Sequence, residues 1–330
     1  MLLERLSSTD GSLPAELLTE LTALYASNRE FHALSGDFPD PDDVRPEQVA
    51  VALADELAHP DAEVLLARWG SPRSSEAESG GGGRVVGIVI TLARHPDPAD
   101  SDPWIGLLMV DAAEQGKGYG RRVAALVEER FRAAGRRAVR LAVLDNNPKG
   151  LAFWTALGYE TVDHRPDRAH GRPCAVLRKV LRTPRRAARV AVVDPEGAVL
   201  LFRYDNVEVG VHWALPGGGL EPGEGPVEGA LRELAEETGW TDLKPGPLLC
   251  TWEHDFTRFD IPVRQHEHIY VTHGPRREPA GPALAAAHAA DGILTWRWWT
   301  RRELAEQAEP VWPPDLARLL DEWAGRAGGV

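Results

Sequence analysis

The chain reads GGLEPGE over residues 218–224 and, after seven more residues, RELAEETGW over residues 232–240. Glu233, Glu236 and Glu237 stand at i, i+3 and i+4, so they share one face of the helix predicted over residues 227–238. Like charges at this spacing destabilise an exposed helix, and hard divalent cations with oxygen ligands compensate them well. The pattern therefore predicts a metal site, and the alternative is a solvated acidic helix after a glycine turn.

The flanking residues add to the pattern. Arg232 is adjacent to the glutamates and can pair with a carboxylate to hold it in place. Gly239 follows the last helical turn, where a left-handed cap residue is favoured. The run Pro216–Gly219 frees the backbone to pass close to a ligand and to offer main-chain groups to it.

This stretch resembles the Nudix box, a glycine, five residues, Glu, seven residues and then Arg-Glu-apolar-x-Glu-Glu-x-Gly-apolar. It matches at Gly218, Glu224, Arg232, Glu233, Leu234, Glu236, Glu237, Gly239 and Trp240. The resemblance covers about residues 187–324. It implies an enzyme that cleaves a nucleoside diphosphate linked to another moiety, with Mg²⁺ or Mn²⁺ as its metal.

The resemblance also implies roles for these residues. Metal ligands would be Glu233, Glu236 and Glu237, with the main chain of Gly218. Glu233 would also activate water, Arg232 would orient the glutamates, and Glu224 would complete the outer shell. Nudix enzymes often take a further ligand or base from a later strand or loop, and Glu267 within Gln265–His268 is the favoured candidate. The alternative there is a charged strand face. His266 and His268 alternate with Glu267 and would face the opposite side.

A second glycine turn, Gln115–Arg122, follows a predicted strand over residues 104–110 and opens a predicted helix over residues 118–134. Free amides at a helix N-terminus bind anions, and absent side chains let a diphosphate approach. The spacing is not that of the dinucleotide fingerprint. Taken alone, the turn is weak evidence for such a site and favours a plain strand–turn–helix.

The context of this turn resembles the acyl-CoA-binding motif of GNAT-family acetyltransferases. The resemblance rests on Leu108-Met109-Val110 before the turn, on Asn146-Asn147 and Gly150 after it, and on Phe153-Trp154 and Gly158-Tyr159. It covers about residues 1–180 and implies acetyl-CoA as the cosubstrate of N-acetylation of an amine. Coenzyme-binding residues would be Met109, Val110, Gln115, Gly116, Lys117, Gly118, Tyr119, Gly120, Arg121 and Asn147. The main-chain amides at Met109 and Val110 would stabilise charge developing on the carbonyl.

Two departures separate this half from an active acetyltransferase. Many GNAT members carry a tyrosine as the acid toward the leaving thiolate where this chain has Trp154, so Tyr159 or water would take that role. The strand over residues 104–110 also lacks a carboxylate where a base is often found. The alternative to a bifunctional enzyme is therefore a Nudix hydrolase fused to a non-catalytic acyl-CoA sensor.

The segment Arg182–Arg186 is charged, contains a proline and has no apolar face, so it predicts a domain boundary. We expect an α/β (α+β) protein of two domains. Residues 1–182 would form a GNAT-like mixed sheet with flanking helices, and residues 183–330 a Nudix α/β/α sandwich. The glycine-rich run within Ser71–Gly83 predicts a surface loop.

Composition limits the partners. Fifty acidic against 37 basic residues give a formal net charge of −13, which argues against duplex nucleic acid as a partner. Charge at the N-terminus and two distant cysteines favour a cytoplasmic protein with no membrane partner. A nucleotide diphosphate, acetyl-CoA and an amine acceptor are the expected small-molecule partners, and nothing in the sequence specifies an oligomeric state.

Overall fold

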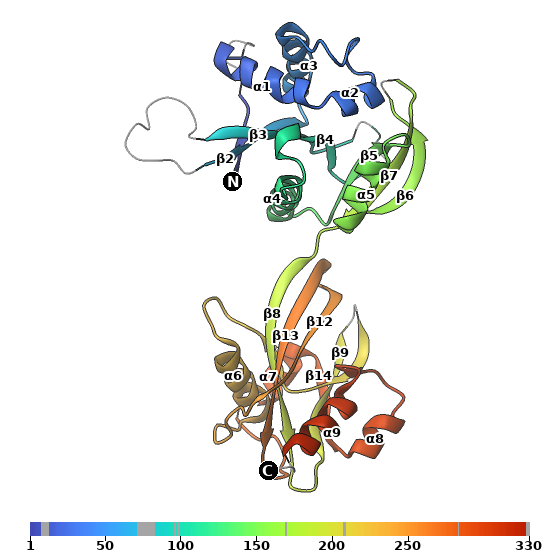
Figure 1. Ribbon diagram of the computed structural model, residues 1–330. Coiled ribbons are helices and arrows are strands. Elements are labelled where there is room, and N and C mark those ends of the chain that lie inside the picture. The colour runs from blue at the N-terminus through green and yellow to red at the C-terminus, as the bar shows by residue number, and fades with distance from the viewer. Residues whose placement is uncertain are drawn as a thin grey trace, which may run out of the picture. The chain divides into compact units, whose positions relative to one another are not determined.

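The computed structural model describes residues 1–7, 13–70, 83–95, 97, 100–168, 170–206, 209–282 and 284–327. Two compact units make up the chain, Met1–Leu181 and Arg182–Val330 (Figure 1). The division lies one residue before the boundary expected from the sequence. The loop expected within Ser71–Gly83 lies outside the described residues, except for Gly83. Among the residues that are described, no helix is long and apolar enough to cross a membrane.

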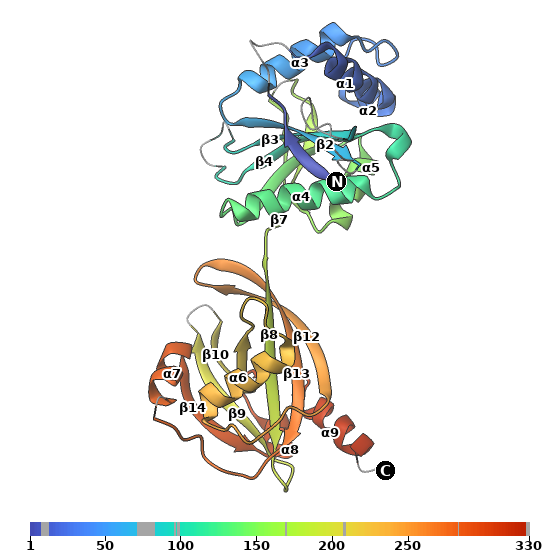
Figure 2. The same cartoon turned by 90° about the vertical axis from the view of Figure 1, so that its left-hand side faces the viewer.

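The first unit is a seven-stranded sheet covered by helices on both faces (Figures 1 and 2). Its order is β1-β2-β3-β4-β5-β7-β6. The strands are β1 (Leu2–Arg5), β2 (Ala62–Trp69), β3 (Arg84–Leu92), β4 (Trp104–Val110), β5 (Ala138–Leu144), β6 (Glu160–Pro166) and β7 (Pro173–Val180). The helices are α1 (Ala15–Ser27), α2 (Arg29–Ser35), α3 (Pro46–Ala58), α4 (Tyr119–Ala133) and α5 (Pro148–Ala156), with a short 3-10 turn η1 (Ala112–Glu114).

Two separate cores explain why the central strands are apolar at nearly every position. Leu66 and Ile88 pack toward α1 and α3, whereas Leu65 and Val89 pack toward α4 and α5. A strand buried on both faces reads as a continuous apolar run because successive side chains point to opposite sides.

The strands β4 and β5 diverge at the centre of this sheet. They pair in parallel only at Trp104↔Arg140 and Ile105↔Leu141. On its other edge β4 pairs with β3 from Trp104 to Val110, with one irregularity between Ile90 and Thr91, and the Asp111 amide donates to the Val86 carbonyl at 3.0 Å. An antiparallel ladder alternates its hydrogen-bonded pairs, so the Met109 amide faces β3 and the Val110 amide faces the opening beside β5.

The second unit is an eight-stranded sheet that opens into two halves. The path is β12-β13-β8-β9-β10-β15, with β11 on β8 and β14 on β9. Because β8 and β9 pair only at Val193↔Val199, the two halves separate beyond that point. The strands are β8 (Thr183–Val193), β9 (Val199–Asn206), β10 (Gly210–Ala214), β11 (Gly217–Gly219), β12 (Leu248–Arg258), β13 (Ile261–His273), β14 (Ile293–Trp299) and β15 (Val311–Trp312).

Four helices complete this unit: α6 (Pro226–Thr238), α7 (Leu284–Asp291), α8 (Arg301–Glu306) and α9 (Leu316–Ala327). Ala230 and Leu234 of α6 enter one core, and Leu316 and Leu320 of α9 enter the other. Figure 2 shows α6 across the sheet strands and α9 beside β12 and β13. This is the two-domain α/β architecture expected from the sequence.

The segment Arg182–Arg186, which predicts the domain boundary, is not a loop: β8 begins at Thr183 and pairs in parallel with β13 from Thr183↔Val263 onward. Pro184 is tolerated in the strand because β11 joins the other edge of β8 only at residues 187–189. The short elements β1, α2 and β6 were not predicted, because segments this brief or exposed show little periodicity.

Candidate functional sites

Arg232 lies at the centre of the acidic helix face. Its Nε donates to Glu224 Oε1 at 2.9 Å, and its Nη2 donates to Glu224 Oε2 at 3.0 Å and to the Gly219 carbonyl at 2.9 Å. Its Nη1 donates to Glu233 Oε1 at 2.9 Å and to Glu236 Oε2 at 3.1 Å. One guanidinium therefore holds three carboxylates and the glycine turn together, and it lowers the pKa of Glu224.

Gly218 lies directly against the Glu233 carboxylate. A Cβ built on Gly218 would be 2.7 Å from both carboxylate oxygens, so a side chain at this position would displace Glu233. Burial raises the pKa of Glu233, against the opposing effect of Arg232. A carboxylate with a raised pKa is a better proton acceptor, which suits a general base. The sequence placed these two residues in one site, and the structure brings them into contact.

Glu237 shares the helix face but reaches into the interior, where it is 2% exposed. Its Oε1 accepts from the Tyr204 hydroxyl at 2.9 Å and its Oε2 from the Gly217 amide at 2.7 Å. Burial raises the pKa of Glu237 to about 8 despite these donors. Glu233 and Glu237 therefore differ in surroundings: the first faces the glycine turn, and the second is enclosed.

A buried arginine that the sequence did not single out connects the helix to the distant strand β13. Arg189 donates through Nε to Glu267 Oε1 at 2.9 Å, and through Nη1 to the carbonyls of Leu215 and Gly217 at 2.7 and 2.9 Å. Burial opposes the charge of Arg189, but its nearness to Glu267 outweighs that effect and raises the pKa of Arg189, so the guanidinium stays charged in the interior. Arg189 is a charged residue within the otherwise apolar run 187–193, and this is the sequence signal that could have identified it.

Glu267 is 1% exposed and lies within this buried network. Gln265 Nε2 donates to its Oε1 at 2.5 Å, and Oε2 has no hydrogen-bond partner among the described residues. His266 and His268 alternate with it and are half-buried on the other side, where His266 pairs with Glu253 at 3.0 Å. The alternative interpretation, that Glu267 belongs to an exposed, charged strand face, does not fit a side chain that is enclosed in this way.

Whether these residues can bind a divalent metal depends on the chemistry of their donor atoms and on how those atoms are arranged. Carboxylate and carbonyl oxygens are the donors that Mg²⁺ and Mn²⁺ prefer, and Glu267 Oε2 is a buried acceptor without a donor. The residues are therefore of the right kind. Among the described residues, however, no group of three or more His, Cys, Asp or Glu side chains converges as a metal site. Arg232 occupies Glu233 and Glu236, so a shared coordination sphere requires those side chains to shift.

The glycine turn of the first unit is a main-chain feature. Gly116 and Gly118 adopt φ of +75° and +85°, and an added Cβ on either would meet nothing within 4 Å. Backbone conformation, not crowding, is what calls for glycine there. At Gly120 the reason differs, because a Cβ would lie 3.2 Å from the Phe153 ring of α5. Gly120 therefore permits close packing of α4 on α5.

Side chains around this turn hold the end of β4. Gln115 Nε2 donates to Asn28 Oδ1 at 2.8 Å and to the Val110 carbonyl at 3.1 Å, and Asn28 Nδ2 donates to the same carbonyl at 3.1 Å. Asn28 was not a predicted site residue, since its partner lies 82 positions away. Val110 thus has its carbonyl fixed and its amide directed to the opening. The strand register directs the Met109 amide toward β3, so it does not support the prediction that Met109 also offers its amide to the coenzyme.

The charged and aromatic residues predicted for the turn have mixed surroundings. Lys117 pairs with Glu114 at 3.2 Å, so part of its charge is neutralised. The Tyr119 ring packs edge-on to Trp69 at 5.2 Å. Arg121 is exposed at the start of α4.

Asn147 caps α5, accepting from the Gly150 amide at 2.9 Å. Its side chain is therefore engaged in helix capping.

Tyr159 does not meet the requirement for an acid. It is 1% exposed, and its ring packs edge-on to Trp154 at 5.0 Å. Burial raises the pKa of Tyr159 far above its usual range. The suggestion that Tyr159 replaces the missing tyrosine was therefore wrong, because an enclosed core hydroxyl cannot reach a bound thiolate. Trp154 is also buried in that core.

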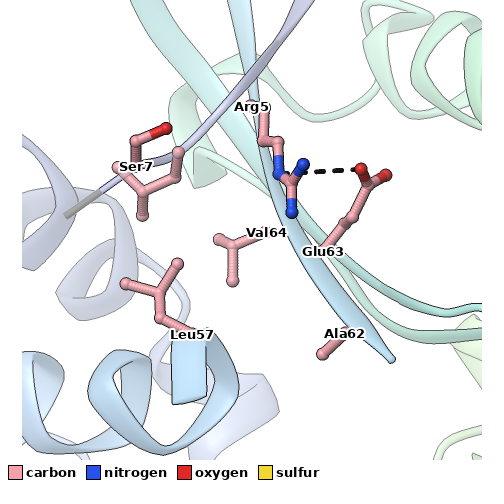
Figure 3. A pocket seen from close by; sticks show the side chains of 7 residues that line it. Arg5, Ser7, Leu57, Ala62, Glu63 and Val64 are labelled. Carbon is pink, nitrogen blue, oxygen red and sulfur yellow. Dashed lines mark ion pairs between the residues drawn. The ribbon is translucent and has the colours of Figure 1, made fainter. Parts of the chain in front are cut away.

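A cavity of about 180 Å³ in the first unit lies between β1, β2 and the end of α3, and Figure 3 shows its lining. Leu57 and Val64 supply its apolar wall, and Arg5 and Glu63 form an ion pair of 3.6 Å beside it. None of the predicted site residues lines this cavity, so it does not contribute to either site.

Comparison with known proteins assigns each half of the chain to a family. Residues 183–322 match the NUDIX domain, and residues 31–159 match the acetyltransferase (GNAT) family. An uncharacterized Nudix hydrolase, orf19, of Rhodococcus erythropolis is 33% identical over 123 residues, which are 34% of this chain and 61% of that protein. The RNA pyrophosphohydrolase of Erythrobacter litoralis is 45% identical over 150 residues, 41% of this chain and 80% of that protein.

Solved structures resemble each half separately. The MutT protein of Methanosarcina mazei aligns with a TM-score of 0.36 and 16% identity, covering 46% of this chain and all of that one. Spermidine N-acetyltransferase of Vibrio cholerae, solved with CoA and spermine, aligns with a TM-score of 0.38 and 11% identity. That alignment covers 54% of this chain and 95% of the other.

Proposed function

Because the chain belongs to the Nudix family through residues 183–322 and to the GNAT acetyltransferase family through residues 31–159, we propose that it is a bifunctional enzyme. The second unit hydrolyses a nucleoside diphosphate linked to another moiety. The first unit transfers an acetyl group from acetyl-CoA to an amine. The observation that supports the hydrolase assignment is the contact between Gly218 and the Glu233 carboxylate, with Arg232 beside it.

In the hydrolase unit, each residue has a task set by its surroundings. Glu233 accepts a proton from the attacking water, because burial makes it a stronger base than an exposed glutamate. Arg232 keeps Glu233 oriented and is itself anchored by Glu224 and the Gly219 carbonyl. Glu237 and Glu267 face the interior, where Arg189 pairs with Glu267. Mg²⁺ or Mn²⁺, held by the glutamates and the main chain of Gly218, would neutralise diphosphate charge and lower the pKa of water.

The hydrolase assignment is tested with full-length protein, Mg²⁺ and a panel of nucleotides. The panel includes a 5′-triphosphorylated RNA oligonucleotide, since several relatives are named RNA pyrophosphohydrolases. We expect release of a nucleoside monophosphate, orthophosphate or pyrophosphate. Glu233→Gln should lower kcat by roughly 10²- to 10⁴-fold, the usual contribution of a general base.

Glu221→Gln is the matched control, since Glu221 is an exposed glutamate in the same glycine loop. It should retain wild-type turnover. Absence of hydrolysis across the whole panel, or equal turnover in Glu233→Gln and wild type, would overturn the assignment.

The first unit is proposed to bind acetyl-CoA at the Gln115–Gly120 turn and at the Val110 amide. The opening between β4 and β5 supports this, because it leaves that amide unpaired by either strand. Calorimetry should detect acetyl-CoA binding, and Gly118→Asp should abolish it by placing a negative side chain at the turn. Gly135→Asp is the control, since Gly135 also has a positive φ, +74°, and open space around it. Equal binding by both variants would refute the site.

A second candidate function for this unit is that of an acyl-CoA sensor without transfer chemistry. Burial of both Trp154 and Tyr159 favours it, because neither side chain can act as the acid. A panel of amines assayed for acetylation decides between the two. Binding of acetyl-CoA without acetylation of any amine would establish the sensor. If acetylation occurs, Tyr159→Phe should leave its rate unchanged.

A further inference from the structure

The end of β4 presents one edge to the opening beside β5, and Val110 is the last residue of the strand on that edge. Val110 lies opposite Gly87 in a non-hydrogen-bonded pair, so its amide and its carbonyl both point away from β3. β5 pairs with neither group, because the β4–β5 pairing ends at Ile105↔Leu141. Partners for these two main-chain groups must therefore come from another segment of the chain or from a ligand.

Two carboxamides occupy the carbonyl of Val110. Asn28 Nδ2 and Gln115 Nε2 each donate to it at 3.1 Å. A main-chain carbonyl has two lone pairs, so these two donors fill its accepting capacity. The edge is therefore saturated as an acceptor, and the group that it directs to the opening is a donor, the Val110 amide.

Asn28 reaches this edge from the junction of α1 and α2, where its neighbours fix it. The residue is buried, with 7% of its surface exposed. Its Oδ1 accepts from Gln115 Nε2 at 2.8 Å, and its Nδ2 also donates to the Leu24 carbonyl at 3.0 Å and to Ser27 Oγ at 3.1 Å. Because these contacts order the carboxamide before any ligand arrives, binding need not order it again.

An edge of this kind distinguishes ligands by whether they bring an acceptor. The carbonyl of an acyl thioester can accept from the Val110 amide, whereas a thioether of the same length leaves that amide unpaired. A site built to hydrogen-bond a ligand group selects against the analogue that lacks it, because the polar group of the site then stays unpaired. This selection requires Val110 to keep one orientation, which the two donors to its carbonyl provide.

We propose that Asn28 is the positioning residue through which the coenzyme site selects acyl-CoA over forms of CoA that lack an acyl carbonyl. This inference rests on the proposed binding of acetyl-CoA at Val110 and at the Gln115–Gly120 turn. Asn28 acts through Val110 and does not itself contact the coenzyme. A transferase must release CoA as its product, and a sensor must register the acyl group, so the same selection serves either function of the first unit.

The test compares two ligands that differ only at the carbonyl. Acetyl-CoA and S-ethyl-CoA are titrated calorimetrically into the full-length protein without any amine, so that no acetyl group is transferred. Wild type should bind acetyl-CoA roughly 2- to 13-fold more tightly, which is the net contribution of one hydrogen bond. Asn28→Ala should bring this preference close to unity, because Val110 loses one of the two donors that hold it. The affinity for S-ethyl-CoA should stay unchanged.

Asn28→Asp provides a second variant, since its carboxylate can still accept from Gln115 but has no donor for the Val110 carbonyl. It should lose the preference as Asn28→Ala does. Ser27→Ala is the matched control, because Ser27 lies at the same end of α1. Its Oγ accepts from the Ala112 amide at 3.0 Å and donates to the Leu24 carbonyl, and it makes no hydrogen bond to Val110. Ser27→Ala should therefore keep the wild-type preference for acetyl-CoA.

Asn28 also caps α1, and a purely structural role would weaken the binding of both ligands alike. Equal weakening of both in the Asn28 variants, up to complete loss, would therefore overturn the proposal, as would an unchanged preference. The two proposals fail in different ways. Failure of wild type to bind either ligand would contradict the coenzyme site itself. Equal affinity of wild type for acetyl-CoA and S-ethyl-CoA would contradict the selection alone.

Discussion

The two sites of this chain are built from different parts of the polypeptide. In the second unit the site consists of charged side chains, with Arg232 holding three carboxylates at the surface and Arg189 opposing Glu267 inside. In the first unit it consists of main-chain groups, exposed by glycines with positive φ and by the divergence of β4 from β5. Side-chain sites are sensitive to lost charge, and main-chain sites are sensitive to backbone conformation.

This difference extends to the role of glycine in each site. Gly116 and Gly118 are needed for their conformation and have open space around them. Gly217 and Gly218 are needed because other groups occupy the space that a side chain would fill: the β8 backbone at Gly217 and the Glu233 carboxylate at Gly218. Two glycine-rich turns with a similar appearance in sequence therefore serve different physical purposes.

The largest effect that separates the two units should come from Arg189→Met. Removing this cation leaves Glu267 buried without its partner, which costs about 3–5 kcal/mol in comparable buried pairs. The free energy of unfolding of the second unit should fall by that amount. Urea unfolding followed by tryptophan fluorescence reports it, because eight of the 11 tryptophans lie at or beyond position 213.

Arg264→Met is the control for Arg189→Met. Arg264 forms an ion pair with Asp255 at 2.8 Å, but its side chain is half exposed. Exposed pairs contribute up to about 1 kcal/mol, so the change should be small. A loss of stability in Arg189→Met no larger than in Arg264→Met would show that the buried network does not support this unit.

The next effect compares two glycines. Gly217→Ala should lower the stability of the second unit by roughly 3 kcal/mol, from overpacking together with a strained φ. Its Cβ would lie 2.6 Å from Arg189 Cα at a φ of +142°. Gly118→Ala should cost the first unit only about 1–2 kcal/mol, because only the left-handed conformation opposes it. Thermal unfolding of both variants measures this, and equal losses would contradict the distinction drawn between the turns.

The last difference is a gradual one, a pH dependence expected of the second unit. Burial raises the pKa of Glu237 to about 8, above its value of 4.5 in the unfolded chain. The folded state therefore binds the extra proton between these values, and stability falls as pH rises through this window. The slope should reach at most about 1.4 kcal/mol per pH unit. It should be seen in metal-free buffer from pH 5.5 to 8.5 and should flatten in Glu237→Gln. A slope unchanged by that substitution would assign the proton elsewhere.

Local sequence patterns predicted several of the helices and strands. The pattern of residues 227–238 predicted α6, observed from Pro226 to Thr238, and the strand and helix predicted over residues 104–110 and 118–134 are observed as β4 and α4. The sequence predicted that Arg232 pairs with a carboxylate, and its i, i+4 spacing from Glu236 places those two side chains on one helix face wherever the helix forms. Arg189 was missed because its partner Glu267 lies 78 positions away and meets it only through the β8–β13 register.

By itself, the sequence determined where helices carry their carboxylates and where the backbone must be glycine. Both are short-range properties, set by the 3.6-residue helical period and by the φ that a residue can adopt. Only the tertiary structure decided which carboxylate is exposed and which is enclosed, and which arginine compensates each. It also directed the Val110 amide toward β5 and the Met109 amide toward β3. These outcomes depend on strand register and burial, which join residues far apart in the chain and leave no fixed spacing behind.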